Sequence, residues 1–410
     1  MQPRQQALSL NKASSLFFRM SAMGAKFLIF TYLSKYFIES TYGIYSLITT
    51  TITVSIFVLG FDFYNFSIRD ILLKKENTSA KVFTAFGFYL GVYLIFVLLG
   101  YFTFKNTDYF SQYTGYLLTI CITEHFNQEL YRLSLAFKKV LAANTLLFIR
   151  VAGWTSMVLI LILFFKKQVS LGDILGIWAY FNVGTILLTA LIFGKAILNE
   201  FSNLAFKKDW LWKGLKVSMI FYVATIALKV IEYSNRYIVE GLLGEASAGI
   251  FSFYSNISMV IGIYVSTIVV SYELPDLIES STTTQFEGKL KRFKRLLVLH
   301  SGIAFAVVLI AIYPVLLWQN KPSFMEYWHL IVLLNIATFL MNISLLYHSY
   351  LYIKHREKKL LEIVLIGSGI NLIATYSLCY FFGITGAGIA FLVTGIAIFA
   401  LRKRAVKQPI

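Results

Sequence analysis

Long apolar stretches follow one another along the whole sequence. Twelve of them run for about 20 residues with few charges, which is the length a helix needs to cross the hydrocarbon core of a bilayer. No long polar segment separates them, so no soluble domain is expected. The pattern predicts spanning helices at 13–36, 42–66, 82–104, 110–135, 141–165, 173–195, 213–238, 247–272, 296–318, 325–352, 361–381 and 384–401.

The composition supports an all-α integral membrane protein. Of the 410 residues 58% are hydrophobic and 14% are charged, and the mean hydropathy is +0.70. The first apolar stretch is too long for a signal peptide and carries Arg19 and Lys26, so we expect it to stay as the first span. Both cysteines fall inside predicted spans, and the sequence has no catalytic, metal-binding or cofactor-binding motif. We therefore expect no cofactor, no metal site and no enzymatic activity.

The basic residues predict the orientation of the chain. The net charge is +17, and 26 of the 37 Lys and Arg fall on one side of the predicted spans, in the tails and alternate loops. By the positive-inside rule this side is cytoplasmic, so both termini should be cytoplasmic. Such basic loops also attract anionic lipid. We therefore expect them to contact membrane lipid and not nucleic acid. The outer loops are short, which disfavours an extracytoplasmic glycosyltransferase or polymerase.

Two segments of the chain resemble each other. Residues 35–39 and 43–46 (KYFIE, GIYS) match residues 236–240 and 249–252 (RYIVE, GIFS), and both copies follow the first span of a six-span half. Six spans bring the chain back to its starting side, so the halves should be parallel repeats. This predicts two six-helix bundles, at 1–200 and 213–410, joined by a cytoplasmic linker at 201–212.

Four short segments carry a family resemblance. Residues 41–47 (TYGIYSL), 60–64 (GFDFY), 69–71 (RDI) and 382–390 (FGITGAGIA) resemble the Wzx-type polysaccharide flippases of the multidrug/oligosaccharidyl-lipid/polysaccharide (MOP) exporter superfamily. The resemblance implies two six-helix bundles around a central cavity that opens alternately to each side. The first span lacks the proline of some drug-exporting relatives, and the twelve spans differ from the fourteen typical of murein-precursor flippases.

Charges inside the spans point to a transport pathway, because they are costly at membrane depth unless they face water or a partner. In the seventh span Lys229, Glu232 and Arg236 share one stripe, and Arg150 lies near mid-bilayer. The alternatives are that Arg19 and Arg236 reach opposite surfaces and that Lys229 pairs with Glu232. The candidates for binding an anionic substrate group are Arg19, Lys26, Arg150, Lys229 and Arg236.

The fourth span is the most polar, and the tenth carries a line of neutral polar residues. Glu124 and Glu129 lie on adjacent lines of the fourth span, where they form either a structural network or an ion-coupling site. Glu232 in the seventh span is the third candidate for ion coupling. Asn335 and Asn342 in the tenth span are candidates for sugar contacts.

The resemblance and the buried basic residues together predict a function. A lipid-linked sugar repeat is joined to its carrier by a diphosphate, which guanidinium groups bind well. We expect a flippase of the bacterial inner membrane that carries an undecaprenyl-diphosphate-linked oligosaccharide outward for O-antigen or another surface polysaccharide, in contact with the polymerase and chain-length machinery. The alternatives are a cation-coupled multidrug exporter of the same superfamily and a membrane polymerase or glycosyltransferase.

Overall fold

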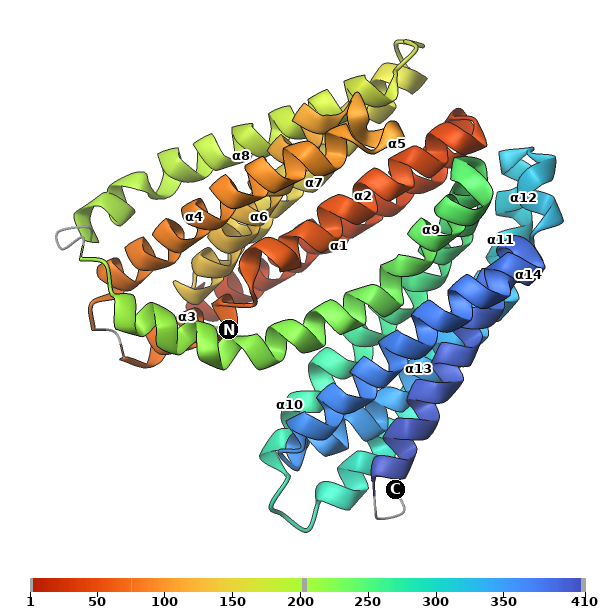
Figure 1. The fold of residues 1–410 in the computed structure, drawn as a ribbon. Coiled ribbons are helices and arrows are strands. Elements are labelled where there is room, and N and C mark those ends of the chain that lie inside the picture. The colour runs from red at the N-terminus through yellow and green to blue at the C-terminus, as the bar shows by residue number, and fades with distance from the viewer. Residues whose placement is uncertain (1–2, 75, 201–204, 407–410) are drawn as a thin grey trace. The chain divides into compact units, whose positions relative to one another are not determined.

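The computed structural model describes residues 3–74, 76–200 and 205–406 (Figure 1). The described residues are mostly helical, and no strand occurs among them. The helices are α1 (Pro3–Tyr36), α2 (Glu39–Gly60), α3 (Tyr64–Lys74), α4 (Thr78–Lys105), α5 (Asp108–Ser111), α6 (Thr114–Ala136), α7 (Val140–Leu163), α8 (Leu171–Glu200), α9 (Lys208–Val265), the π-helix η1 (Ser266–Val270), α10 (Ser271–Glu279), α11 (Phe286–Gln319), α12 (Pro322–Glu326), α13 (His329–Ile353) and α14 (Glu357–Ala405).

Eight helical segments in the described part of the chain are long and apolar enough to cross a membrane. Two of them are much longer than one crossing requires: the segment that runs through α9 to Glu279 has 72 residues, and α14 has 49. Each contains one residue with non-helical backbone angles, Gly244 in α9 and Gly383 in α14. The prediction of an all-helical, multi-pass membrane protein is therefore confirmed.

The chain folds into two compact units. Unit 1 comprises Met1–Tyr32 and Ile48–Thr225, and unit 2 comprises Leu33–Leu47 and Ile226–Ile410. The chain passes between the units inside α1, α2 and α9, so the adjoining ends of α1 and α2 belong with the C-terminal helices. Part of the predicted linker, 201–204, lies outside the described residues. The bundle boundaries drawn from the sequence remain a prediction.

In unit 1, α6 packs against α3, α4, α7 and α8, and α7 also packs against α8. The stacked rings of Trp154 in α7 and Trp178 in α8 have centroids 4.8 Å apart, and both side chains are buried. The polar side chains of α6 are thus enclosed by neighbouring helices.

In unit 2, α13 packs against α11 and α14. One apolar core joins the end of α9, η1, α10, α11 and α13, which explains why the helical path continues to Glu279, beyond the predicted span end at 272. Its fully or nearly fully buried members include Val265, Val269, Leu277, Phe293, Leu297 and Leu346.

The predicted span 42–66 was wrong at its C-terminal end. The helix stops at Gly60, because Phe61 and Asp62 have positive φ angles of 49° and 50°. The Asp62 carboxylate is buried and accepts a hydrogen bond from the Thr225 hydroxyl, with a distance of 2.5 Å. This bond holds the turn, after which α3 starts. Apolar residues continue across the turn, so hydropathy alone does not mark it.

Candidate functional site

The polar side chains that follow one face of α6 are buried and contact side chains of α7 and α8. Glu124 is 7% exposed; its Oε1 accepts a hydrogen bond from Trp178 Nε1 at 2.7 Å, and its Oε2 lies 3.6 Å from Arg150 Nη1. Arg150 Nη2 donates to Gln128 Oε1 at 3.4 Å. The structure therefore brings a predicted anion-binding residue, Arg150, next to a predicted ion-coupling residue, Glu124.

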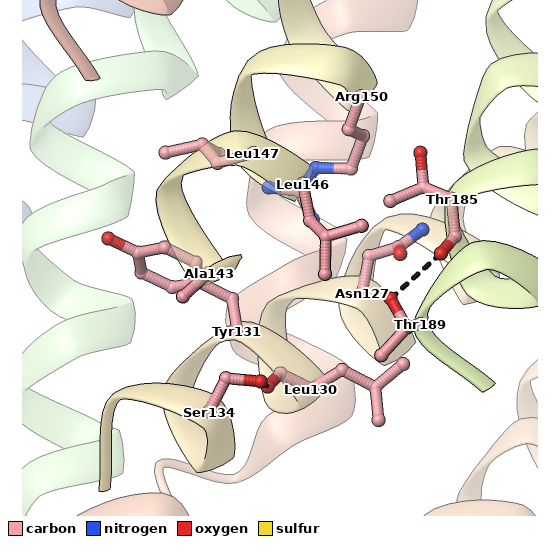
Figure 2. Close-up of a pocket in the computed structure, with 10 residues that line it drawn as sticks. All are labelled: Asn127, Leu130, Tyr131, Ser134, Ala143, Leu146, Leu147, Arg150, Thr185 and Thr189. Carbon is pink, nitrogen blue, oxygen red and sulfur yellow. Dashed lines mark hydrogen bonds between the residues drawn. The ribbon is translucent and has the colours of Figure 1, made fainter. Parts of the chain in front are cut away.

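Arg150 also lines a small pocket between α6, α7 and α8 (Figure 2). The pocket has room for about one water molecule. Its other lining residues are Asn127, Leu130, Tyr131, Ser134, Ala143, Leu146, Leu147, Thr185 and Thr189. In the described residues neither Nε nor Nη1 of Arg150 has a hydrogen-bond partner, so donors are left for such a water.

Glu129, on the adjacent line of α6, is held by two helices. It forms an ion pair with Arg132, and its Oε2 accepts a hydrogen bond from the Tyr89 hydroxyl at 3.0 Å. His125 Nε2 lies 3.8 Å from Glu129 Oε1, and His125 Nδ1 is 2.6 Å from the Tyr93 hydroxyl. These contacts form a buried network that ties α6 to α4.

In unit 2, Arg236 is enclosed by polar oxygens. Its side chain is 2% exposed, and it donates hydrogen bonds to Asn256 Oδ1 at 2.7 Å and to Ser46 Oγ at 3.3 Å. Its guanidinium carbon lies 5.5 Å from the centre of the Tyr233 ring. A buried guanidinium does not match the alternative in which Arg236 reaches a membrane surface.

Lys229 and Glu232 form an ion pair, with 2.6 Å between Nζ and Oε2. The Glu232 side chain is 39% exposed and that of Lys229 is 18% exposed, so the pair is more accessible than that of Arg150 and Glu124. Lys26 in α1 is exposed. The side chain of Arg19 lies outside the described residues.

The two predicted sugar-contact residues are buried in α13 with unsatisfied amides. Asn335 is fully buried, and neither its Oδ1 nor its Nδ2 has a hydrogen-bond partner among the described residues. Asn342 is 5% exposed, and its Nδ2 also lacks such a partner. An unsatisfied buried amide is costly, so these groups are open to a water or a ligand.

Unit 2 contains a second cluster of buried polar side chains, which was not predicted from the sequence. Asn235 Oδ1 accepts hydrogen bonds from Asn371 Nδ2 at 2.7 Å and from Thr375 Oγ1 at 3.1 Å, and Thr394 Oγ1 donates to Asn371 Oδ1 at 3.2 Å. All four side chains are buried. The spacing of Asn371 and Thr375, four residues apart in an apolar helix, was the signal that could have revealed it.

The two copies of the internal repeat meet in unit 2, at equivalent glycines. A Cβ added to Gly43 would lie 1.9 Å from the carbonyl oxygen of Glu245, and one added to Gly249 would lie 2.3 Å from the carbonyl oxygen of Glu39. Each helix therefore approaches the other's backbone more closely than any side chain would permit.

Further bonds hold the end of α1 and the start of α2 near this glycine contact. Gln319 Nε2 donates to Ser34 Oγ at 2.7 Å, and Lys35 Nζ lies 4.4 Å from the Trp318 ring centre. Lys321 Nζ donates to the Phe37 carbonyl and lies 3.9 Å from a carboxylate oxygen of Glu39. Burial lowers the pKa of Lys321, and Glu39 opposes that shift.

Solved structures share this fold. The chain resembles the lipid II flippase MurJ in an inward closed conformation, with a TM-score of 0.73 and 13% identity over 97% of this chain and 87% of MurJ. It resembles an inward-facing MATE multidrug resistance transporter of the MOP superfamily, with a TM-score of 0.71 and 12% identity over 96% of this chain and 97% of that one. A MOP superfamily transporter from Pyrococcus furiosus, described by the reverse polarity of its binding pocket, gives a TM-score of 0.58 and 12% identity over 96% of both chains.

The sequence itself identifies the family. No curated protein matches the chain closely enough to be informative. The model of the family described as polysaccharide biosynthesis protein matches residues 10–279, which is well over half of the sequence. The resemblance predicted from the short segments is thus confirmed: the chain belongs to the polysaccharide biosynthesis protein family and has the fold of the MOP superfamily transporters.

Proposed function

We propose that this protein is a flippase that carries a polyprenyl-diphosphate-linked oligosaccharide repeat across a bacterial inner membrane by alternating access. The family match over residues 10–279 carries the proposal, because it ties the chain to polysaccharide synthesis. The fold shared with a lipid II flippase supports transport of a lipid-linked sugar. The polyprenyl chain stays in the bilayer during transport, so only the polar head needs a hydrated path.

We also propose twelve crossings, with both termini in the cytoplasm. Eight segments qualify as spans, and the breaks at Gly244 and Gly383 divide two of them into two crossings each. Helices α1 and α6 supply the remaining two; α6 is long enough but carries Glu124, Glu129 and Arg132. The matching segments around Gly43 and Gly249 support two repeated six-helix bundles.

The proposed diphosphate-binding groups are the cations inside spans. Arg236 and Lys229 are about two turns apart on α9, and both have polar neighbours that a phosphate oxygen could replace. Lys26, Arg19 and Arg150 complete the proposed set. Asn335 and Asn342 would contact sugar hydroxyls through the amide groups that lack partners in the described residues.

The two ion pairs suggest how binding of the substrate would be linked to binding of a proton. Lys229 is paired with Glu232, and Arg150 with Glu124. A phosphate bound by either cation would displace the carboxylate, which would then take up a proton more readily. Glu129 is paired with Arg132, so a phosphate bound by Arg132 would displace the Glu129 carboxylate in the same way.

Arg236→Lys tests the role of the guanidinium. Lysine keeps the charge but loses the planar, two-pronged donor, so we expect flipping to fall about tenfold, the effect of losing one charged hydrogen bond. The measurement is flipping of a fluorescent polyprenyl-diphosphate glycan in vesicles that contain the purified protein. Lys105→Gln, at an exposed site in unit 1, is the control. Equal rates for both variants would remove Arg236 from the site.

Glu232→Gln tests the coupling. Lys229 then keeps its charge for a phosphate, but the carboxylate beside it that would accept the proton is gone. We expect transport to continue and to lose its response to an imposed pH gradient. The same assay, run with and without the gradient, measures this response. An unchanged response would assign coupling to another residue or to the membrane potential alone.

A chromosomal deletion tests the function as a whole. We expect cells without the protein to lose surface polysaccharide and to accumulate the lipid-linked repeat in the inner leaflet. The fold shared with MATE transporters favours drug export as a second candidate. A deletion strain with normal polysaccharide and increased drug sensitivity would establish that candidate instead.

We also propose that the protein contacts the polysaccharide polymerase, because the polymerase would use the flipped repeat. Cross-linking tests this contact.

A further inference from the structure

A large open pocket lies between α3 and α6. It encloses about 1170 Å³ of empty space, part of it open to solvent. All of its lining residues belong to unit 1. They are Tyr64, Asn65, Ile68, Arg69, Leu72, Leu73, Arg132, Leu135 and Ala136. Figure 1 shows α3 as a short helix beside the bundle of unit 1.

The pocket has an aliphatic wall and a cationic rim. Leu72 and Leu73 are 46% and 73% exposed, so α3 presents two large apolar side chains beside Arg69. Arg69 is exposed and makes no hydrogen bond or ion pair within the described part of the chain. A short helix that presents leucines and an arginine together suits the interface of a membrane, where the leucines enter the acyl region and the cation meets head groups.

Arg132 gives the rim a fixed second donor. Its guanidinium carbon lies 3.5 Å from the centre of the Tyr64 ring, and one of its nitrogens is bonded to Glu129. Its Nε and Nη2 atoms have no hydrogen-bond partner among the described residues. Because Glu129 offsets the charge of Arg132, the rim carries about one net positive charge, which comes from Arg69.

We propose that this pocket binds an anionic phospholipid of the cytoplasmic leaflet. The single net charge complements a phosphodiester, which carries one negative charge, better than a diphosphate with more. Arg69 and the free nitrogens of Arg132 would hold the phosphate oxygens, and Ile68, Leu72 and Leu135 would contact the acyl chain. The site lies on the face that the distribution of Lys and Arg predicts to be cytoplasmic, where anionic lipid is concentrated.

The pocket is tested by photo-cross-linking of the full-length protein. Benzoylphenylalanine replaces Leu72 in protein reconstituted in vesicles of phosphatidylethanolamine, with phosphatidylglycerol and polyprenyl diphosphate as minor components, and mass spectrometry identifies the adducts. The same probe at Ile310, which is 75% exposed on an apolar helix, reports the bulk lipid. We expect the share of phosphatidylglycerol to be about fivefold higher at position 72, as expected for one basic residue at a membrane surface.

Arg69→Gln should remove this enrichment, whereas Lys208→Gln, which neutralises an exposed lysine outside the pocket, should keep it. Because Arg69 is exposed and has no bonds to the described residues, its replacement should leave folding intact. Equal adduct profiles at positions 72 and 310, or equal enrichment in both charge variants, would overturn the site. Polyprenyl diphosphate as the main adduct would also overturn it and would assign the pocket to the transported lipid. Neither result bears on whether the protein is a flippase.

Discussion

Replacement of Gly43 or Gly249 by alanine should sharply reduce stability and transport. The new Cβ would lie 1.9 Å or 2.3 Å from a backbone carbonyl oxygen, and a backbone atom cannot rotate away as a side chain can. The helices would have to separate, at a cost of about 1–3 kcal/mol, the usual cost of overpacking. The measurements are the thermal unfolding temperature of the purified protein and the restoration of surface polysaccharide in a deletion strain.

Gly241→Ala is the matched control for this contact. Gly241 lies in α9 like Gly249, on the other side of the break at Gly244, and a Cβ there meets nothing within 4 Å. Alanine should be neutral or slightly stabilising at this position because it has the higher helix propensity. If Gly43→Ala and Gly249→Ala behave like Gly241→Ala, the close approach is not required.

The effect on transport follows from where the glycines lie. They join the start of α2 to α9 within unit 2, at the end of these helices that the charge distribution predicts to be external. The bonds of Ser34, Phe37 and Glu39 with Gln319 and Lys321 lie in the same region. Separation of α2 from α9 would disturb this packing within unit 2, so we expect transport to fall together with stability.

The fold was largely predictable from hydropathy because the bilayer imposes one length and one polarity on each crossing. The predicted loops at 239–246 and 382–383 contain the non-helical residues Gly244 and Gly383. The end of α2 was not predictable, because Phe61 and Phe63 on either side of the turn are as apolar as a span. The helix breaks at the positive φ angles of Phe61 and Asp62, and the hydrogen bond that Asp62 accepts from Thr225 joins residues 163 positions apart in the sequence.

The roles proposed for the charged residues inside the spans remain a prediction. Arg150, Arg236 and Glu124 are each less than a tenth exposed, as expected for charges that have partners at membrane depth. Spacing within one helix also revealed the pair of Lys229 and Glu232 as an alternative. The pair of Arg150 and Glu124 joins different helices, so helical periodicity could not indicate it. The same holds for Gly43 and Gly249, whose contact no local pattern reports.

Arg150→Leu should destabilise the protein by about 3–5 kcal/mol, the cost of leaving a buried carboxylate without its cation. Glu124 would keep its bond from Trp178 but lose the compensating charge. The double variant Arg150→Leu/Glu124→Leu should recover most of this stability, because two apolar residues of suitable volume replace a buried ion pair at little cost. Thermal unfolding of the purified single and double variants measures both effects.

The double variant also separates the two roles considered for Arg150. If Arg150 binds the substrate diphosphate, the stable double variant should still fail to flip a polyprenyl-diphosphate glycan, and Arg150→Lys, which keeps the charge, should retain partial activity. If the pair serves only to hold α6 against α7, the double variant should flip at the rate of the unmodified protein. That second result would restrict the proposed anion site to the remaining cations, with Arg236 and Lys229 of unit 2 at its centre.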